Sequence, residues 1–331
     1  MVYIYKKMIS EKPYYYLRAS KREGKRIVAK DLVYLGNNIE TVRKEISNLS
    51  KYKVEIRKAY RKINLFLESE YYKNKTKNLK LKEDIFLDEQ LINIEAIKLH
   101  YKDKFKKENL TTQKEILRNF LINFAYNTAS IEGNTITLKE AQNLLEKGKT
   151  PKDKTLREIY DLQNTEKLFN NLFAKKNKIT HKFIENLHKE LMLNIDQRTG
   201  YRLKDVKVFR SHFDSTPGPY IKTDMGLLLK WYNENMKKLH PFVLAVIFHH
   251  KFEKIHPFMD GNGRIGRMLM NVILMNNNYP PIIISKKDRT EYLDSLASAD
   301  KINLNEINQK YKKIVKFSAI QMENFYWNIF L

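Results

Sequence analysis

A glycine-rich turn between two apolar helical segments is the feature that most constrains the fold of this chain. The segment before the turn has an amphipathic helical pattern, formed by Val243, Leu244, Ile247 and Phe248. This helix must end before Pro257, because proline disfavours helical backbone in the residue that precedes it. Residues 260–263 read DGNG and favour a turn, since glycine and asparagine tolerate positive φ. A second helix then begins, with an apolar face made of Met268, Leu269, Val272 and Ile273.

Helical periodicity extends over most of the chain after residue 110. Capping boxes are predicted at residues 112–115 and 137–140, and Gly133 marks the end of the first of these helices. Residues 201–220 instead show short alternation followed by a proline–glycine break, which favours a β-hairpin. The predicted fold class is mainly α, with a hairpin inside the core and a β-rich N-terminus. Further helices are expected over residues 154–174, 180–193, 223–238, 241–254, 288–299 and 304–327.

The first forty residues differ in character from the rest. Short β-prone runs at 14–17, 27–28 and 32–35 are separated by a basic turn around Gly24 and end at Gly36. This pattern predicts a small basic hairpin or three-stranded piece. Such a small sheet is marginal alone, so it is expected to pack against another part of the chain.

Composition excludes several classes of protein. With 42% hydrophobic and 12% aromatic residues the chain has enough apolar material to fold, and no apolar run reaches the length of a membrane span. It has no cysteine, so disulfides and thiolate metal sites are excluded, and we expect a cytoplasmic protein. The net charge of +24 has two interpretations: contact with nucleic acid, nucleotides or acidic proteins, or lysine that simply decorates solvated helices.

The turn carries the residues expected of a phosphate site. A glycine-rich turn that opens a helix directs backbone N–H groups at one point, where the positive helix N-terminus favours an anion. Arg264 and Arg267 share a helix face beside these amides, and Asp260 can hold the Mg²⁺ that accompanies a polyphosphate. His256 can accept a proton from a hydroxyl. A histidine before proline is usually structural, as in the HPF tripeptide at residues 240–242, so the ordered combination is what indicates function.

Residues 256–267 read HPFMDGNGRIGR, which resembles the HPFx(D/E)GNGRxxR signature of the Fic-domain family. The resemblance covers about residues 112–303 and implies a Fic-type helical core with an inserted β-hairpin flap. Fic enzymes are mostly AMP transferases that modify Tyr, Ser or Thr side chains with Mg-ATP. The resemblance therefore implies a protein adenylyltransferase with ATP as substrate and Mg²⁺ as cofactor.

The family's functional residues map directly onto this motif. The resemblance makes His256 the general base and Asp260 the Mg²⁺ ligand. The amides of residues 261–263 and the Asn262 side chain would bind the α-phosphate, with Arg264 on the β-phosphate and Arg267 on the γ-phosphate. The expected nucleotide-binding residues are thus Gly261, Asn262, Gly263, Arg264, Arg267 and, near the adenine, Tyr292.

Two further segments resemble accessory parts of the family. Residues 201–220 resemble the flap that pins the target segment, with Val206, Val208 and Phe209 in it. Residues 128–134 read TASIEGN and resemble the (S/T)xxxE(G/N) inhibitory motif, formed here by Thr128, Glu132 and Gly133. In such relatives the glutamate pairs with the second motif arginine, here Arg267, and misplaces the γ-phosphate. The plain alternative is that Glu132 only ends a helix.

The residue patterns and the resemblance together predict four parts. These are a small basic β-rich segment at 1–38, a charged helical linker at 39–107, a Fic core at 108–303 that includes the inhibitory helix, and a C-terminal helix at 304–331. The resemblance itself leaves the first hundred residues unexplained. A target protein with a modifiable hydroxyl is the implied partner, and because such relatives are often dimers a homodimer stays open. Two other functions stay open: removal of AMP from a modified protein at the same site, and nucleic-acid binding by the basic, tyrosine-rich N-terminus.

Overall fold

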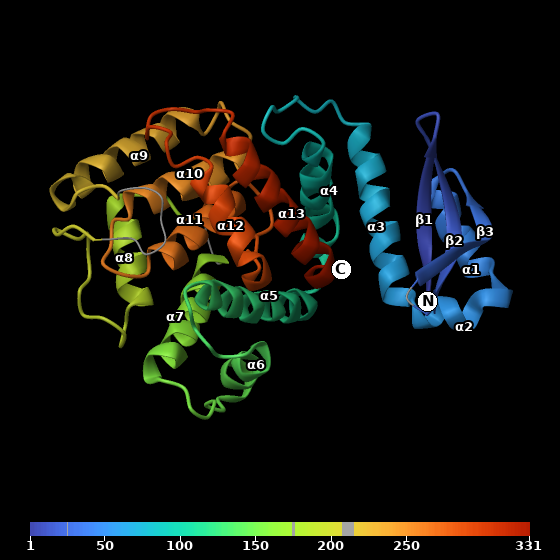
Figure 1. The fold of residues 1–331 in the computed structure, drawn as a ribbon, viewed down its shortest axis with the longest axis horizontal. Helices are drawn as coiled ribbons and strands as arrows, with labels where there is room; N and C mark the ends of the chain where they lie inside the picture. Colours follow the sequence, from blue (N-terminus) through green and yellow to red (C-terminus); the bar gives the residue numbers. More distant parts are fainter. Residues whose placement is uncertain (25, 174–175, 207–214) are drawn as a thin grey trace.

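The computed structural model describes residues 1–24, 26–173, 176–206 and 215–331. A helical body makes up most of the molecule, and a small sheet lies at one end of it, joined by helix α3 (Tyr60–Lys77) (Figure 1). The two parts have separate hydrophobic clusters, a large one within the helices and a smaller one under the sheet. Among the described residues, none of the helices combines the length and apolar character that a membrane crossing needs.

The N-terminal sheet has three antiparallel strands, β1 (Val2–Ile9), β2 (Lys12–Glu23) and β3 (Arg26–Gly36), in the order β1-β2-β3. The turn at Gly24 and the end of β3 at Gly36 both use positive φ, which confirms the predicted breaks. One face of the sheet packs on α1 (Ile39–Asn48) and α3, with α2 (Lys53–Lys58) beside β1. The cluster beneath the sheet includes Val2, Ile4, Tyr15, Leu17, Leu35, Val42 and Ile63.

The helical body has α10 (Pro241–Ile255) and α11 (Asn262–Asn276) at its centre, with most side chains of both helices buried. These are the two apolar helices predicted around the turn. Short 3-10 turns occur at Ser50–Tyr52, Phe105–Lys107, Gly218–Tyr220 and Lys286–Asp288. The other helices are α4 (Gln90–Asp103), α5 (Leu110–Ile131), α6 (Leu138–Lys147), α7 (Leu156–Phe173), α8 (His181–Leu191), α9 (Ile221–Asn235), α12 (Arg289–Ala297) and α13 (Tyr311–Ile329).

Helix boundaries follow most of the predicted caps and differ at two. The Thr137–Glu140 capping box is present at the start of α6, and α5 ends at Ile131, just before Gly133. The start of α5 differs, because the Asn109 side chain accepts a hydrogen bond from Thr112 N and caps the helix earlier than predicted. The final helix begins at residue 311 rather than 304, since turns occupy much of the segment before it.

Residues 39–107 are shared between the two cores. Helices α1 and α3 close the cluster under the sheet, whereas α4 contributes Ile94, Ala96 and Ile97 to the large cluster. Helix α3 contacts both α1 and α4, so it is the element that connects the two parts. The N-terminal sheet thereby lies well away from the α10–α11 hairpin (Figure 1).

Candidate active site

The loop between α10 and α11 is held by its own side chains. Helix α10 ends at Ile255, and His256 takes a left-handed conformation with φ +54° that turns the chain. The Asn262 side chain closes the loop, because its Oδ1 accepts from Phe258 N at 2.9 Å and its Nδ2 donates to Phe258 O at 2.8 Å. The Phe258 ring stacks on His188 of α8 at 3.8 Å between centroids, and the His188 Nε2 lies 3.0 Å from Asp260 O. The loop therefore has a defined shape before any ligand binds.

The N-terminus of α11 presents unpaired backbone donors. Gly261 precedes the helix with φ +81°, a conformation that favours glycine. The first-turn amides of residues 262–264 have no partner within the helix, and no described side chain caps them. Since the Asn262 side chain is occupied in the loop, the backbone amides are the groups that face a ligand here. An N-terminus of this kind is an anion-binding site.

His256 is placed as a proton acceptor. Burial lowers the pKa of the imidazole, so the ring is neutral at neutral pH. Its Nδ1 lies 3.3 Å from Glu253 O, an acceptor, which assigns the ring proton to Nδ1 and leaves the Nε2 lone pair free. Arg202 orients the turn, because its Nε donates to His256 O at 2.8 Å and its backbone N donates to Pro257 O at 2.9 Å. Sequence patterns did not reveal this function of Arg202.

The buried guanidinium of Arg267 is bound by the end of helix α5 through its Nε and Nη2. Its Nη2 pairs with Glu132 Oε1 at 2.7 Å, and its Nε donates to Thr128 Oγ1 at 2.7 Å. Desolvation raises the pKa of Glu132, but the charge and hydrogen bond of Arg267, together with the charge of Arg264, outweigh it and hold that pKa below its usual value. A Cβ added to Gly263 would come within 2.1 Å of Glu132 Oε1, so this carboxylate lies directly over the helix N-terminus.

Helix α7 supplies counter-ions for the other two charged motif residues. Asp161 pairs with the Nη1 of Arg264, a side chain that is only 2% exposed, and Asp260 Oδ1 lies 3.1 Å from its Nη2. Arg157, one turn earlier on the same helix, pairs with the second carboxylate oxygen of Asp260. Neither Arg157 nor Asp161 was identified from the sequence, because both lie about a hundred residues before the motif. Every charged residue proposed to bind Mg-ATP is thus paired within the protein.

Comparison with known proteins agrees with this geometry. Residues 178–274 match the Fic/DOC family model. The chain therefore carries a Fic domain. It is 36% identical over 184 residues to the protein adenylyltransferase Fic of Drosophila erecta, covering 53% of this chain and 36% of that protein. It is 28% identical over 231 residues to the protein adenylyltransferase fic-1 of Caenorhabditis elegans, covering 68% of this chain and 45% of that protein. The chain spans less than half the length of these curated relatives.

Solved structures share the fold. A Fic-domain signaling protein from Bacteroides thetaiotaomicron superposes with a TM-score of 0.63 at 24% identity, covering 71% of this chain and 95% of that one. Fic-1 (aa134–508) from C. elegans gives a TM-score of 0.59 at 24% identity, covering 87% of this chain and 86% of that one. These likenesses show a Fic-type helical fold, as the sequence predicted.

Behind the Fic motif lies a buried polar layer. Tyr292 is 2% exposed, its hydroxyl lies 2.6 Å from His249 Nε2, and its ring lies 5.9 Å from the Arg267 guanidinium carbon. The Tyr292 ring therefore packs against the Arg267 guanidinium while Glu132 is bound to it. The contact of Tyr292 with adenine stays a prediction. Burial raises the pKa of Glu253 to about 8, and its Oε1 would collide with a Cβ on Gly266. Glycine at 266 lets α10 and α11 approach closely around this carboxyl group.

The predicted flap residues and the histidines near the motif complete the description of this region. Val208 and Phe209 of the predicted flap lie outside the described residues. Val206 lies in backbone without regular secondary structure, and its carbonyl accepts from Ser215 Oγ at 3.2 Å. The neighbouring His249 and His250 side chains do not face one common metal site. His250 Nε2 lies 3.2 Å from Asp300, whereas His249 contacts Tyr292. His240, whose HPF tripeptide mimics the motif, caps α10 and binds Glu95.

Proposed function

We propose that this chain is a protein adenylyltransferase that transfers AMP from Mg-ATP to the hydroxyl of a Tyr, Ser or Thr side chain of a target protein. The observation that carries the proposal is a neutral imidazole at the rim of an uncapped helix N-terminus with two buried arginines behind it. In-line displacement at phosphorus requires a base, N–H groups that donate hydrogen bonds to the phosphate, and cationic groups. The curated relatives named protein adenylyltransferase support the same activity.

The proposed reaction follows from the groups present. His256 Nε2 accepts the proton of the target hydroxyl as its oxygen attacks the α-phosphorus of ATP. The new bond joins the target oxygen to the α-phosphorus, the bond to the bridging oxygen breaks, and pyrophosphate leaves. The amides of residues 262–264 stabilise the charge that develops on the α-phosphate oxygens. Gly261 N, which the motif also implied, already donates to Asp260 Oδ1 at 2.6 Å, so the proposed set is shifted by one residue. Arg264 and Arg267 hold the β- and γ-phosphates, so that attack and departure lie in line.

Asp260 is suited to hold the magnesium ion that we propose for this reaction. Its side chain is 32% exposed and already receives a cationic partner, the Arg157 guanidinium. A carboxylate that attracts a cation at the mouth of a phosphate site fits an oxygen-preferring divalent ion. When bound, Mg²⁺ would neutralise the phosphates. Arg157 must then release one carboxylate oxygen.

We further propose that Glu132 inhibits the enzyme by occupying Arg267. The Arg267–Glu132 contact and the position of the carboxylate over Gly263 support this function. While the pair persists, the γ-phosphate lacks its cation and meets a negative carboxylate near the helix N-terminus. The α-phosphate is then not presented for attack. Target modification would need displacement of Glu132.

Intact mass spectrometry after incubation with Mg-ATP tests both proposals. The Glu132→Gly variant should gain the mass of AMP by self-modification, whereas the parent should gain much less. The matched control is the double variant Glu132→Gly/His256→Ala, which keeps the open site but lacks the base and should gain nothing. If the double variant is labelled as fast as Glu132→Gly, the base assignment is wrong; if the parent equals Glu132→Gly, the inhibition is wrong.

Removal of AMP is the second candidate at this site. The Glu132 carboxylate over Gly263 is positioned to orient a water molecule toward a bound phosphate. Incubating the parent with a target protein that already carries AMP distinguishes the two. Release of AMP by the parent, lost in Glu132→Gly, would make hydrolysis the main reaction.

A further inference from the structure

The two faces of the N-terminal sheet differ. Side chains alternate across a strand, and Tyr15 and Leu17 of β2 are fully buried against the helices. Their neighbours Tyr14, Tyr16 and Arg18 therefore point to the opposite face. No described helix packs on that face, because α1 and α3 both cover the inner one.

Tyrosines from all three strands meet on this outer face. The register pairs Tyr5 with Tyr16 across β1 and β2, and Tyr16 with Tyr34 across β2 and β3. The Tyr34 ring lies 5.3 Å from that of Tyr16 and 6.2 Å from that of Tyr14, and Tyr34 is 52% exposed. We define the tyrosine face as the side chains of Tyr3, Tyr5, Tyr14, Tyr16 and Tyr34.

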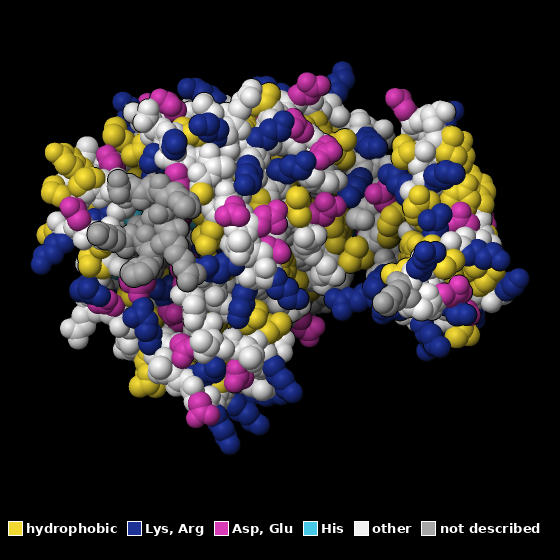
Figure 2. Space-filling view, viewed as in Figure 1, with side chains coloured by type: hydrophobic (Ala, Val, Ile, Leu, Met, Phe, Trp, Pro, Cys, Tyr) yellow, Lys and Arg dark blue, Asp and Glu magenta, His cyan; other side chains and the backbone are white. Residues whose placement is uncertain are grey.

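Basic side chains surround the tyrosine face. The guanidinium of Arg18 lies 3.5 Å above the Tyr5 ring and pairs with Asp31. By the same register Lys7, Lys12 and Arg22 point to this side. Figure 2 shows side chains of the hydrophobic class, which includes Tyr, together with Lys and Arg over the strands. The face thus combines flat aromatic rings with mostly positive charge.

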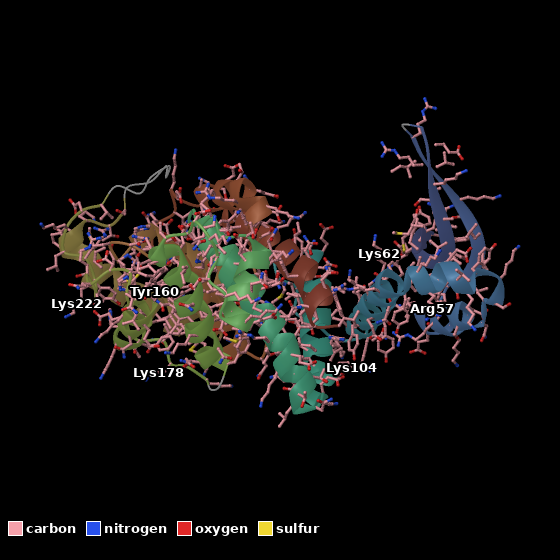
Figure 3. All side chains as sticks on the ribbon, turned by 90° about the horizontal axis from the view of Figure 1, so that it is seen from below. Arg57, Lys62, Lys104, Tyr160, Lys178 and Lys222 are labelled. Atoms are coloured by element: carbon pink, nitrogen blue, oxygen red, sulfur yellow. The ribbon has the colours of Figure 1, made fainter. Side chains whose placement is uncertain are left out.

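We propose that the tyrosine face binds single-stranded nucleic acid. Aromatic rings on an uncovered sheet face are suited to stack on unpaired bases, with the exposed Tyr34 ring the most accessible of the five and the others half-buried. The flanking cations are suited to the phosphates between the bases. An acidic protein would use the cations but would not need rings open to stacking. A duplex hides its base faces and would use the basic edges of the β2–β3 hairpin, which extends from the helices (Figure 3).

Fluorescence anisotropy with the full chain tests this surface. The probe is a labelled thymidine strand of roughly 15 nucleotides, compared with a duplex of equal length. We expect tighter binding of the single strand, with an affinity that falls as salt rises. Removing three cations in Lys7→Gln/Lys12→Gln/Arg22→Gln should reduce the salt slope by about 2, since each phosphate contact on a single strand contributes roughly 0.7.

Matched variants separate this face from the general positive charge of the protein. The control Lys147→Gln/Lys149→Gln/Lys152→Gln removes three exposed cations from the helical body and should leave the slope nearly unchanged. Tyr34→Ala should weaken binding roughly tenfold through loss of one stacked base, whereas Tyr34→Phe keeps the ring and should bind as the parent does. Thermal melts of each variant verify that the sheet is still folded.

Three outcomes would overturn the proposal. These are no binding of the single strand at low salt, an equal loss in the control triple variant, and tighter binding of the duplex. Equal binding by Tyr34→Ala and Tyr34→Phe would contradict stacking of a base on the Tyr34 ring. None of these results depends on AMP transfer, so they leave the function proposed for the Fic domain untouched.

Discussion

Replacing Arg157 with alanine should tighten the binding of Mg-ATP, because the substitution releases the carboxylate of Asp260. The magnitude follows from the exposure of the two side chains, which is 56% for Arg157 and 32% for Asp260. Water screens such a pair, and exposed ion pairs typically contribute about 0.2–1 kcal/mol. The expected gain in affinity is therefore about 1.4- to 5-fold. The gain should shrink at high salt, as expected for a screened contact.

Isothermal calorimetry in the Glu132→Gly background measures this gain directly. Using that background removes the stronger competitor at Arg267, so that the Asp260 pair alone decides the difference. The experiment compares Glu132→Gly with Glu132→Gly/Arg157→Ala at low and high salt. Lys167→Ala is the matched control, since it removes an exposed cation from the same helix about 15 Å further along.

Weaker binding in the Arg157→Ala variant would refute the reasoning. That result would mean that Arg157 moves onto the phosphates when ATP binds and contributes more there than it withholds at Asp260. An equal gain from Lys167→Ala would also refute it, because a general change in charge would then explain both variants.

Two further predictions follow from the burial of charged groups. Asp161→Ala should lower the free energy of unfolding by about 3 kcal/mol in urea titrations, because it leaves the buried Arg264 charge without its main partner, whereas the exposed Glu146→Ala should change it little. A loss no larger than that of Glu146→Ala would contradict this pairing. AMP transfer by Glu132→Gly should rise as pH rises through the lowered pKa of His256, so the acid limb of the rate profile should lie below pH 6.5. An acid limb above neutral pH would exclude a buried, neutral imidazole as the base.

Local sequence signals predicted the structure well where short-range chemistry decides it. Pro257 ends α10, the turn at residues 260–263 opens α11, and the capping box at residues 137–140 starts α6. The three-stranded N-terminal sheet follows from its β-prone runs and glycine breaks in the same way. Each of these features depends on backbone preferences within a few residues, which a single sequence contains.

The partners of the motif depend instead on tertiary packing. Helical periodicity indicates which face of α7 is apolar, but it does not indicate which charged residue of that helix meets Arg264 or Asp260. The pairs with Asp161 and Arg157 bridge 103 residues of sequence. The Asn262 side chain shows the same limit, because the motif predicts a phosphate ligand while the folded loop uses that side chain to hold Phe258.

Helix α7 connects the inhibitory segment to the phosphate loop. Its residue Glu158 accepts hydrogen bonds from Thr135 N at 2.9 Å and Thr135 Oγ1 at 2.6 Å, just beyond Glu132. From the same part of α7, Arg157 pairs with Asp260 and Asp161 pairs with Arg264, so this helix also holds the loop between α10 and α11. These contacts hold the backbone on both sides of the Arg267–Glu132 pair, so we expect the Glu132 carboxylate to be displaced by side-chain rotation rather than by movement of α5. A buried arginine that loses this carboxylate is left uncompensated, and an incoming phosphate supplies the negative charge it lacks. The proposed inhibition would thus keep the proposed phosphate site assembled, which predicts that Glu132→Gly binds ATP without rearrangement of the α10–α11 hairpin.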